Sequence, residues 1–175
     1  MIHEVREFLK SKEKSKIFSY KNNKKNATMD FFVWSNLFSL LRYILFLIVR
    51  PLPIPPFYRW VYRLCGTKIG REVFFASDVL IDPFYPSLIS IGDNCILGWG
   101  CRILAHEGYL RHFRLGRVKI GNNVVVGSFS TIRAGVTIGD NVIIAIGAVV
   151  DKDVPSNRVV GGIPEHEIKH ITKIT

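Results

Sequence analysis

The fold of this chain is decided by residues 120–150, which read I-GNNVVV-GSFSTI-RAGVTI-GDNVII-AIGAVV. In this stretch every sixth residue is bulky and apolar: Ile120, Val126, Ile132, Ile138, Ile144 and Val150. The same spacing continues toward the N-terminus in two further groups, Ile91, Leu97 and Ile103, and Ile69, Phe75 and Ile81. An amphipathic helix repeats every 3.6 residues and a half-buried strand every second residue, so a period of six excludes either as the sole organising element.

A six-residue period is typical of a β-helix, in which short flat strands are joined by turns and stacked as coils. The bulky residue and the residue two places before it, such as Cys95 or Val124, are expected to point inward. Three repeats make one triangular coil, so the matching repeats predict about four coils, with insertions at 85–90 and 109–118. An all-β sandwich is the alternative. The turns that begin at Gly92, Gly121 and Gly139 recur in phase with the repeat and favour the β-helix.

Composition narrows the function classes. A length of 175 residues suits one domain with an appendage. Two of the three cysteines, Cys95 and Cys101, hold inward positions of the repeat, which indicates small core residues in a reducing compartment rather than a disulfide framework. The net charge is +10, but the basic residues are dispersed and no nucleic-acid-binding motif accompanies them. We therefore predict no nucleic-acid partner, and an anionic membrane surface or a phosphorylated cofactor fits the charge better.

The first 68 residues differ from the repeat. Residues 1–30 are rich in Lys, Asn and Ser and predict a basic, mobile tail. Residues 31–68 predict hydrophobic and interfacial helices with a Pro-rich connector at 50–56. The second of these helices, 57–64, is expected to end at Gly66, with Tyr58, Trp60 and Tyr62 suited to an interface between membrane and water.

Residues 31–49 raise the question of a membrane span. This segment is almost wholly apolar, but Ser35, Asn36, Ser39 and Arg42 lie on one side of the expected helix. Its length is near the minimum of about 20 residues for a span, and both flanks are basic. We therefore expect a cytoplasmic protein held peripherally at the inner face of the cell membrane by an in-plane or re-entrant helix. A helix packed on the β-helix or on a partner subunit is the alternative. The apolar run begins too late for a cleaved signal peptide.

The repeat breaks after Ile103. His106 and Glu107 stand where small core residues are expected, and an insertion follows at 109–118 that carries Arg111, His112 and Arg114. A regular coil cannot absorb the insertion, so we expect it to project as a loop beside His106. Imidazole titrates near neutral pH, which makes His106 a candidate general base. A structural histidine is the alternative interpretation.

Several motifs together carry a resemblance to a known family. They are Ile103-Leu-Ala-His106-Glu-Gly, Val118-Lys-Ile-Gly-Asn-Asn-Val124, Gly127-Ser128, Gly135-Val-Thr-Ile-Gly-Asp-Asn-Val142, Gly147-Ala-Val-Val-Asp-Lys152 and Val160-Gly-Gly-Ile-Pro164. Over residues 66–172 the chain resembles the hexapeptide-repeat acetyltransferases, and among these it is most similar to O-acetyltransferases of sugars and surface polysaccharides. The lead-in at 45–66 is similar to that of exopolysaccharide acetyltransferases.

The resemblance implies an all-β fold with a left-handed parallel β-helix at 69–163, followed by a short C-terminal helix at 164–175. It also implies a homotrimer with active sites between subunits, acetyl-CoA as the acyl donor and a sugar or polysaccharide acceptor. His106 matches the general base that takes the proton of the acceptor hydroxyl. Ser128 matches a position that stabilises the tetrahedral oxyanion, with a turn residue as the alternative.

The resemblance also assigns the two substrate sites. Lys152 and Lys169 match residues that meet the phosphates of CoA, and Ala145, Ile146 and Gly147 border its pantetheine arm. Two departures from the family pattern affect these contacts: Ile146 replaces a common Ala, and Asp151 replaces a common Thr next to Lys152. For the acceptor we expect Asp82, Glu107, Arg111 and Arg114 to contribute, although Asp82 could be a turn residue and Glu107 could orient His106.

Two other functions are compatible with a β-helix. The γ-type carbonic anhydrases hold a metal with three His ligands, whereas His106 and His112 are not joined by a third His within the repeat, so we predict no metal. A non-catalytic scaffold or membrane-docking subunit is the second alternative, because fold does not establish function. The residues do not identify the acceptor, which can be a lipid-linked or surface-polysaccharide precursor or a soluble sugar.

Overall fold

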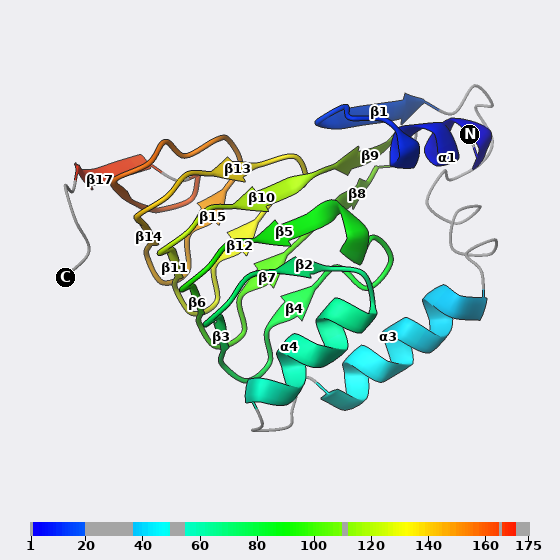
Figure 1. Cartoon of the computed structure of the whole chain (residues 1–175). Coiled ribbons are helices and arrows are strands. Elements are labelled where there is room, and N and C mark those ends of the chain that lie inside the picture. The colour runs from blue at the N-terminus through cyan, green and yellow to red at the C-terminus, as the bar shows by residue number, and fades with distance from the viewer. Residues whose placement is uncertain (1, 20–36, 50–54, 110–111, 165, 171–175) are drawn as a thin grey trace.

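The computed structural model describes residues 2–19, 37–49, 55–109, 112–164 and 166–170. Their centre is a parallel β-helix with three faces (Figure 1). Two helices lie at the end where the first coil begins, and the N-terminal segment lies along one side.

Each face of the β-helix is one sheet. The first sheet contains β2 (Lys68–Ile69), β5 (Ile89–Ile91), β10 (Val118–Ile120) and β13 (Thr137–Ile138). The second contains β3 (Phe74–Phe75), β6 (Ile96–Leu97), β11 (Val125–Val126), β14 (Val142–Ile144), β16 (Arg158–Gly161) and β17 (His166–His170). The third contains β4 (Leu80–Ile81), β7 (Arg102–Ile103), β12 (Thr131–Ile132) and β15 (Val149–Val150). Each coil takes one strand from each sheet in turn, so the four predicted coils are confirmed.

The core of the β-helix consists of the bulky residues of the repeat. Each of the twelve apolar residues that define the period of six is at most 8% exposed. They stack directly on one another, as in the parallel register that pairs Ile103 with Ile132 and Ile132 with Val150. Cys95 and Cys101 are buried between them as free thiols, and burial raises the pKa of the Cys101 thiol to about 12. Each coil therefore buries the apolar residues of the coil before it.

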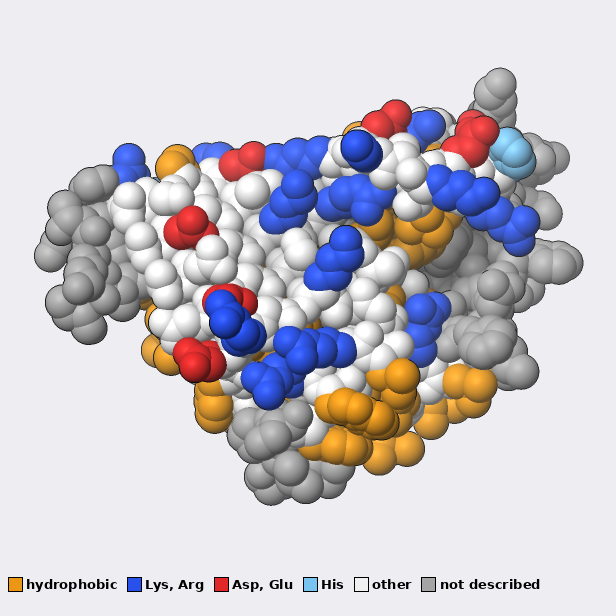
Figure 2. All heavy atoms as spheres, in the orientation of Figure 1, with side chains coloured by type: hydrophobic (Ala, Val, Ile, Leu, Met, Phe, Trp, Pro, Cys, Tyr) orange, Lys and Arg blue, Asp and Glu red, His pale blue; other side chains and the backbone are white. Residues whose placement is uncertain are grey.

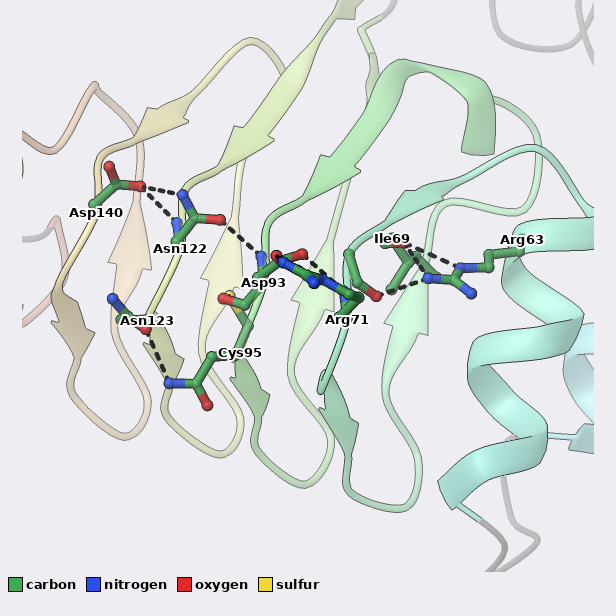
Figure 3. Close-up of polar contacts among 10 residues, drawn as sticks. Arg63, Ile69, Arg71, Asp93, Cys95, Asn122, Asn123 and Asp140 are labelled. Atoms are coloured by element: carbon green, nitrogen blue, oxygen red, sulfur yellow. Dashed lines mark hydrogen bonds and ion pairs between the residues drawn. The ribbon is translucent and has the colours of Figure 1, made fainter.

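Polar side chains form ladders along the turns between the first and second sheets. Asn94, Asn123, Asn141 and Asn157 all adopt left-handed backbone conformations, and each of the first three donates a side-chain hydrogen bond of 2.9–3.0 Å to the next. Figure 3 shows a parallel row in which Asp140 and Asn122 accept from the turn of the preceding coil. Asn tolerates a positive φ better than other residues with a side chain, which explains its recurrence in the sequence.

Helix α4 (Pro55–Leu64) covers the first coil. The predicted end at Gly66 is confirmed: Gly66 has a φ of +108°, its N–H donates to the Arg63 carbonyl and the Thr67 N–H donates to the Tyr62 carbonyl. Arg63 joins the helix to the β-helix by donating to the carbonyls of Ile69 and Gly70 (Figure 3). The expected interfacial role of Tyr58 and Tyr62 is wrong, because α4 packs that side on Phe75 and buries both rings.

Helix α3 (Leu37–Val49) packs beside α4. Phe46 meets the Tyr62 ring edge-on at 4.9 Å between centroids and is buried, as is Val49. No helix in the described parts of the chain is long and apolar enough to cross a membrane. The first six residues of the predicted apolar segment, 31–36, and the connector at 50–54 lie outside the described residues.

The N-terminal segment differs from the predicted mobile tail. Residues 2–10 form helix α1 (Ile2–Lys10), and strand β1 (Ser15–Ser19) pairs antiparallel with β9 (His112–Gly116). Arg117 holds the C-terminal end of α1, because its guanidinium donates to the carbonyls of Phe8, Ser11 and Glu13. Composition could not reveal this order, since its partners lie about a hundred residues away.

The insertion after the second coil is a hairpin rather than the expected loop. Strand β8 (His106–Gly108) pairs antiparallel with β9, and β1 extends this sheet on the other side. Phe113 and Leu115 of β9 are buried in the core, while Arg114 between them is partly exposed. Strand pairing satisfies backbone groups that an irregular buried loop would leave without partners.

The C-terminal segment is a strand where a helix was expected. β17 pairs antiparallel with the edge of β16, which offers it a row of backbone hydrogen-bonding groups. Residues 165 and 171–175 lie outside the described part of the chain.

Candidate active site

His106 stands on β8 where the second coil ends, and the carboxylate of Asp82 holds it. Asp82 follows β4 in the first coil, and its Oδ2 lies 2.5 Å from His106 Nδ1. Asp82 follows Ile81 by one position and His106 follows Ile103 by three, and Ile81 and Ile103 are partners in the parallel pair β4–β7, so stacking of the coils puts both residues at the same corner. Since a carboxylate accepts the bond, Nδ1 is assigned the proton and Nε2 is left with the lone pair.

Asp82 is itself fixed by backbone donors. Oδ1 accepts from the N–H groups of Phe84 and Tyr85 at 3.0 and 3.2 Å, and Oδ2 accepts from those of Ala105 and His106 at 2.9 and 3.0 Å. Its side chain is 0% exposed. Both oxygens of Asp82 thus have partners within the chain, and its contact with an acceptor hydroxyl stays a prediction. The geometry makes Asp82 a candidate for orienting His106 and fixing its tautomer.

Aromatic rings surround the imidazole. Phe84 meets it edge-on at 5.5 Å between centroids, Tyr85 at 5.8 Å, and Phe113 of β9 lies tilted at 5.8 Å. Burial, with the charge of Asp82 beside it, raises the pKa of Tyr85, so this ring stays neutral. The His106 side chain remains 22% exposed. A partly desolvated base with an open edge suits proton transfer to a substrate that displaces the remaining water.

Glu107 belongs to a separate ionic cluster. Arg133 donates to both of its carboxylate oxygens, from Nε at 3.0 Å and from NH2 at 2.8 Å, and the Tyr109 hydroxyl donates at 2.8 Å. Burial alone raises the pKa of Glu107, but these hydrogen bonds and the charges of Arg133 and Arg114 outweigh it and lower the pKa below its ordinary value. Glu107 therefore does not orient His106, and its carboxylate is already occupied.

The remaining predicted acceptor residues are only partly placed. Arg114 lies on β9, 3.9 Å from Glu107 Oε2, and so joins the same cluster. Arg111 lies outside the described residues. Arg114 has no interaction with His106 among those of the described residues.

The Glu107 cluster yields a prediction about stability and pH. Arg133→Met is expected to lower the free energy of unfolding at pH 7 by about 1–3 kcal/mol, because Glu107 stays buried without its bidentate partner. The folded pKa of Glu107 is depressed, so its contribution is present above the unfolded pKa and is lost as the pH falls through the folded value. Urea unfolding at pH 7 and at about pH 3.5 should therefore show a smaller loss in acid.

Arg102→Met is the matched control for that measurement. Arg102 is exposed on β7, which pairs with the strand that precedes Arg133, and its replacement should change stability little at either pH. An equal loss at both pH values for Arg133→Met would show that packing of the arginine, rather than its ion pair, is responsible.

Ser128 and the predicted pantetheine residues occupy another corner of the β-helix. Ser128 lies in the turn before β12, whereas His106 follows the end of β7, so the two stand at opposite ends of the third sheet. Ala145, Ile146 and Gly147 form the corresponding turn of the next coil, and the Gly147 N–H donates to the Ser128 carbonyl at 2.9 Å. Within one chain, Ser128 is therefore not brought to His106.

An apolar ridge marks this second corner. Trp99 and Ile146 stand at equivalent places, two residues after Leu97 and Ile144, whereas Phe129 stands three residues after Val126 in the coil between them; all three are exposed. Trp99 and Phe129 contact each other with 4.9 Å between centroids. Ile146 thus adds exposed apolar surface at this corner, and an alanine in its place would add less.

The predicted phosphate contacts lie elsewhere. Lys152 is exposed just after β15, and the neighbouring Asp151 lies 3.8 Å from Arg133 NH1. Arg133 therefore offsets the negative charge that the sequence places beside Lys152. The backbone of Lys169 pairs with Val159 at the β16–β17 edge.

Three site residues were missed from the sequence. Tyr85 and Phe113 lie in the two predicted insertions and Phe84 lies directly before the first, where the sequence has no periodicity that could have marked them. Within the described ranges, no three His, Cys, Asp or Glu side chains lie close enough together to hold a metal ion.

Sequence comparisons place these residues among known proteins. The family described as "Bacterial transferase hexapeptide (six repeats)" matches residues 117–152, and "Hexapeptide repeat of succinyl-transferase" matches residues 88–105. "Putative acetyltransferase YvoF" of Bacillus subtilis (strain 168) is 40% identical over 123 residues, 70% of this chain and 72% of that protein. "Galactoside O-acetyltransferase" of Escherichia coli (strain K12) is 36% identical over 121 residues, which cover 63% of this chain and 58% of that protein.

Solved structures agree on the fold. A maltose O-acetyltransferase from Clostridium difficile 630 is 26% identical with a TM-score of 0.57, covering 88% of this chain and 92% of its own. A hexapeptide-repeat acetyltransferase from Vibrio cholerae O1 biovar eltor, VCA0836, solved in complex with acetyl-CoA, is 19% identical with a TM-score of 0.62, covering 85% and 93%. This chain therefore forms a left-handed β-helix, as the resemblance of its repeat to this family implied.

Proposed function

Because the chain belongs to the hexapeptide-repeat acetyltransferases, we propose that it transfers an acetyl group from acetyl-CoA to a hydroxyl of a sugar. The observation that carries this proposal is the pair Asp82–His106, in which a buried carboxylate accepts from Nδ1 of an imidazole whose side chain stays 22% exposed. Two of the similar proteins are named for the O-acetylation of galactosides and of maltose, which favours a sugar acceptor.

The residues divide the chemistry among them. His106 Nε2 takes the proton from the acceptor hydroxyl as its oxygen becomes the nucleophile, and it returns that proton to the departing sulfur. Asp82 stabilises the imidazolium between these two transfers and keeps Nε2 pointed outward. The rings of Phe84, Tyr85 and Phe113 limit water around the base. Acetyl-CoA supplies the activated thioester.

The residues predicted to bind acetyl-CoA can act together only across an interface between two copies of the chain. The exposed ridge of Trp99, Phe129 and Ile146 suits the apolar pantetheine arm, and Lys152 suits a phosphate, yet these groups lie at opposite ends of the third sheet. A self-assembly in which one copy's ridge faces the next copy's His106 corner would join them, and would bring Ser128 to the oxyanion. The separation of these groups within one chain supports a homotrimer whose active sites lie between subunits.

The acceptor of this proposal is a lipid-linked or surface-polysaccharide precursor. A purified full-length chain is expected to release free thiol from acetyl-CoA when such a glycan or a simple glycoside is supplied, and to leave an alkali-labile ester on it. Surface glycans of cells lacking the protein should lose acetyl groups of about 42 Da each, the mass change of O-acetylation. Unchanged glycans together with no transfer to any glycoside would refute a sugar acceptor.

A further inference from the structure

Helices α3 and α4 leave a continuous apolar face uncovered. Its members are between 38% and 67% exposed: Leu40, Leu41, Ile44, Leu47 and Ile48 on α3, and Phe57, Trp60 and Leu64 on α4. Figure 2 shows hydrophobic side chains gathered over these helices at the lower edge of the molecule. Single exposed apolar residues are ordinary, but a cluster of this size on two adjacent helices marks an interaction surface.

A groove opens on the same face. Its volume is about 420 Å³, and it lies between the two helices, lined by Leu41, Arg42, Leu45, Leu64 and Cys65. Four of the five lining side chains are apolar. The groove can therefore bind a hydrocarbon chain, with the Arg42 side chain at its edge.

The segment of sequence that carries this face has charges of one sign only. Between Asp30 and Glu72 the sequence contains no Asp or Glu, and its basic residues there are Arg42, Arg50, Arg59, Arg63, Lys68 and Arg71. In Figure 2, Lys and Arg side chains lie directly above the hydrophobic cluster. Arg71 pairs with Asp93, which leaves Arg59, Arg63 and Lys68 as the described cations beside the two helices. Apolar side chains flanked by such cations complement a surface of anionic lipids. A second copy of the chain would present the same positive charge to itself, which disfavours pairing of the two faces.

The apolar face is connected to the candidate active site. Tyr43 of α3 stacks on Phe84, with 6.0 Å between centroids and 15° between planes. Phe84 in turn meets the His106 ring edge-on at 5.5 Å. The helix that carries the apolar face thus supplies the outer wall beside the proposed base.

We propose that the α3–α4 face docks on an anionic lipid bilayer, at the inner face of the cell membrane, and turns the Tyr43–Phe84 side of His106 toward membrane-resident acceptors. Docking depends only on the helices. The statement about acceptors rests on the proposed function and names its substrate class as hydroxyls of lipid-linked glycans. α3 and α4 lie along the surface in this arrangement, and their apolar side chains enter the boundary between headgroups and acyl chains.

Vesicle sedimentation tests docking without donor or acceptor present. The full chain is expected to bind vesicles of phosphatidylcholine mixed with phosphatidylglycerol and to bind phosphatidylcholine alone much more weakly. Leu47→Ser with Ile48→Ser should weaken binding about 10- to 100-fold through lost apolar burial. Arg59→Gln with Lys68→Gln should weaken it roughly 30-fold through two lost charges. Ile17→Ser, an equally exposed apolar position on β1, is the control and should bind normally.

Tryptophan fluorescence gives an independent test of which surface docks. Trp60 on α4 is 61% exposed and Trp99, which is not part of the apolar face, is 52% exposed, so the two are matched in exposure. With Trp34, which lies outside the described residues, replaced by Phe in both proteins, anionic vesicles should shift the emission of the Trp99→Phe variant to the blue. The Trp60→Phe variant should show no such shift.

Three outcomes would overturn docking by this face: unchanged vesicle binding in the α3 double variant, a blue shift that persists in Trp60→Phe, or loss of self-association in the α3 variant without any vesicle binding. Circular dichroism and thermal unfolding first establish that each variant is folded. Because these measurements need no turnover, docking can succeed while the proposed function fails. A docked protein that acetylates soluble glycosides but no vesicle-bound glycan would refute the acceptor class alone.

Discussion

Replacing His106 with alanine is expected to lower the kcat of acetyl transfer about 10²- to 10⁴-fold, the usual contribution of a positioned general base. The effect should fall on kcat, because without an imidazole at this position nothing takes the proton from the acceptor hydroxyl. Binding of CoA should change little, since Lys152 lies two coils away from His106 and the exposed ridge lies at the other end of the third sheet. Steady-state kinetics with a confirmed acceptor, together with calorimetric titration of CoA, would measure both quantities.

His112→Ala is the control for this prediction. His112 is exposed at the start of β9 and contacts the Ser19 hydroxyl at 3.1 Å, outside the aromatic walls around His106. It should retain most of the activity. Near-normal turnover of His106→Ala would contradict the mechanism and leave the fold unaffected. Unfolding of that variant would identify His106 as a structural histidine.

Asp82→Asn is expected to have the second large effect, also about 10²- to 10⁴-fold on kcat. An amide can present its NH₂ group to Nδ1, which favours the tautomer with the proton on Nε2 and removes the lone pair that the base requires. The KM for acetyl-CoA should stay nearly constant. The variant should also be less stable by about 1–3 kcal/mol, because an NH₂ group then faces backbone N–H donors in a buried place.

The matched control is Asp93→Asn, the same change in an Asp on another corner. Asp93 is paired with Arg71 in the exposed ladder, and its replacement should leave kcat unaltered. Assays are run below the unfolding temperature of each variant, so that stability and turnover are separated. If Asp82→Asn lost stability but kept its kcat, Asp82 would be a structural turn residue and His106 would act without it.

The sequence by itself determined the β-helix, its coils and its core. Each strand pairs with the strand one coil away, and these strands share one six-residue pattern, so a period in the sequence states the register directly. The break at His106 could be found for the same reason, because any departure from a strict period is visible without knowledge of contacts. The end of the helix at Gly66 could also be predicted from the sequence, since a positive φ at a helix end favours glycine.

Only the tertiary structure decided what the break contains. Asp82 and His106 are 24 residues apart, and the stacking of β4 on β7 decides which carboxylate reaches the ring, so Glu107 next to it in sequence was an equally reasonable candidate. The strand β1 and the helix α1 gain their order from β9 and Arg117, more than ninety residues away. Pairings across such separations leave no period in the sequence, because their energy depends on which open edges the folded coils present. The repeat thus determined the scaffold, and the non-repeating segments acquired their roles only when the scaffold placed them side by side.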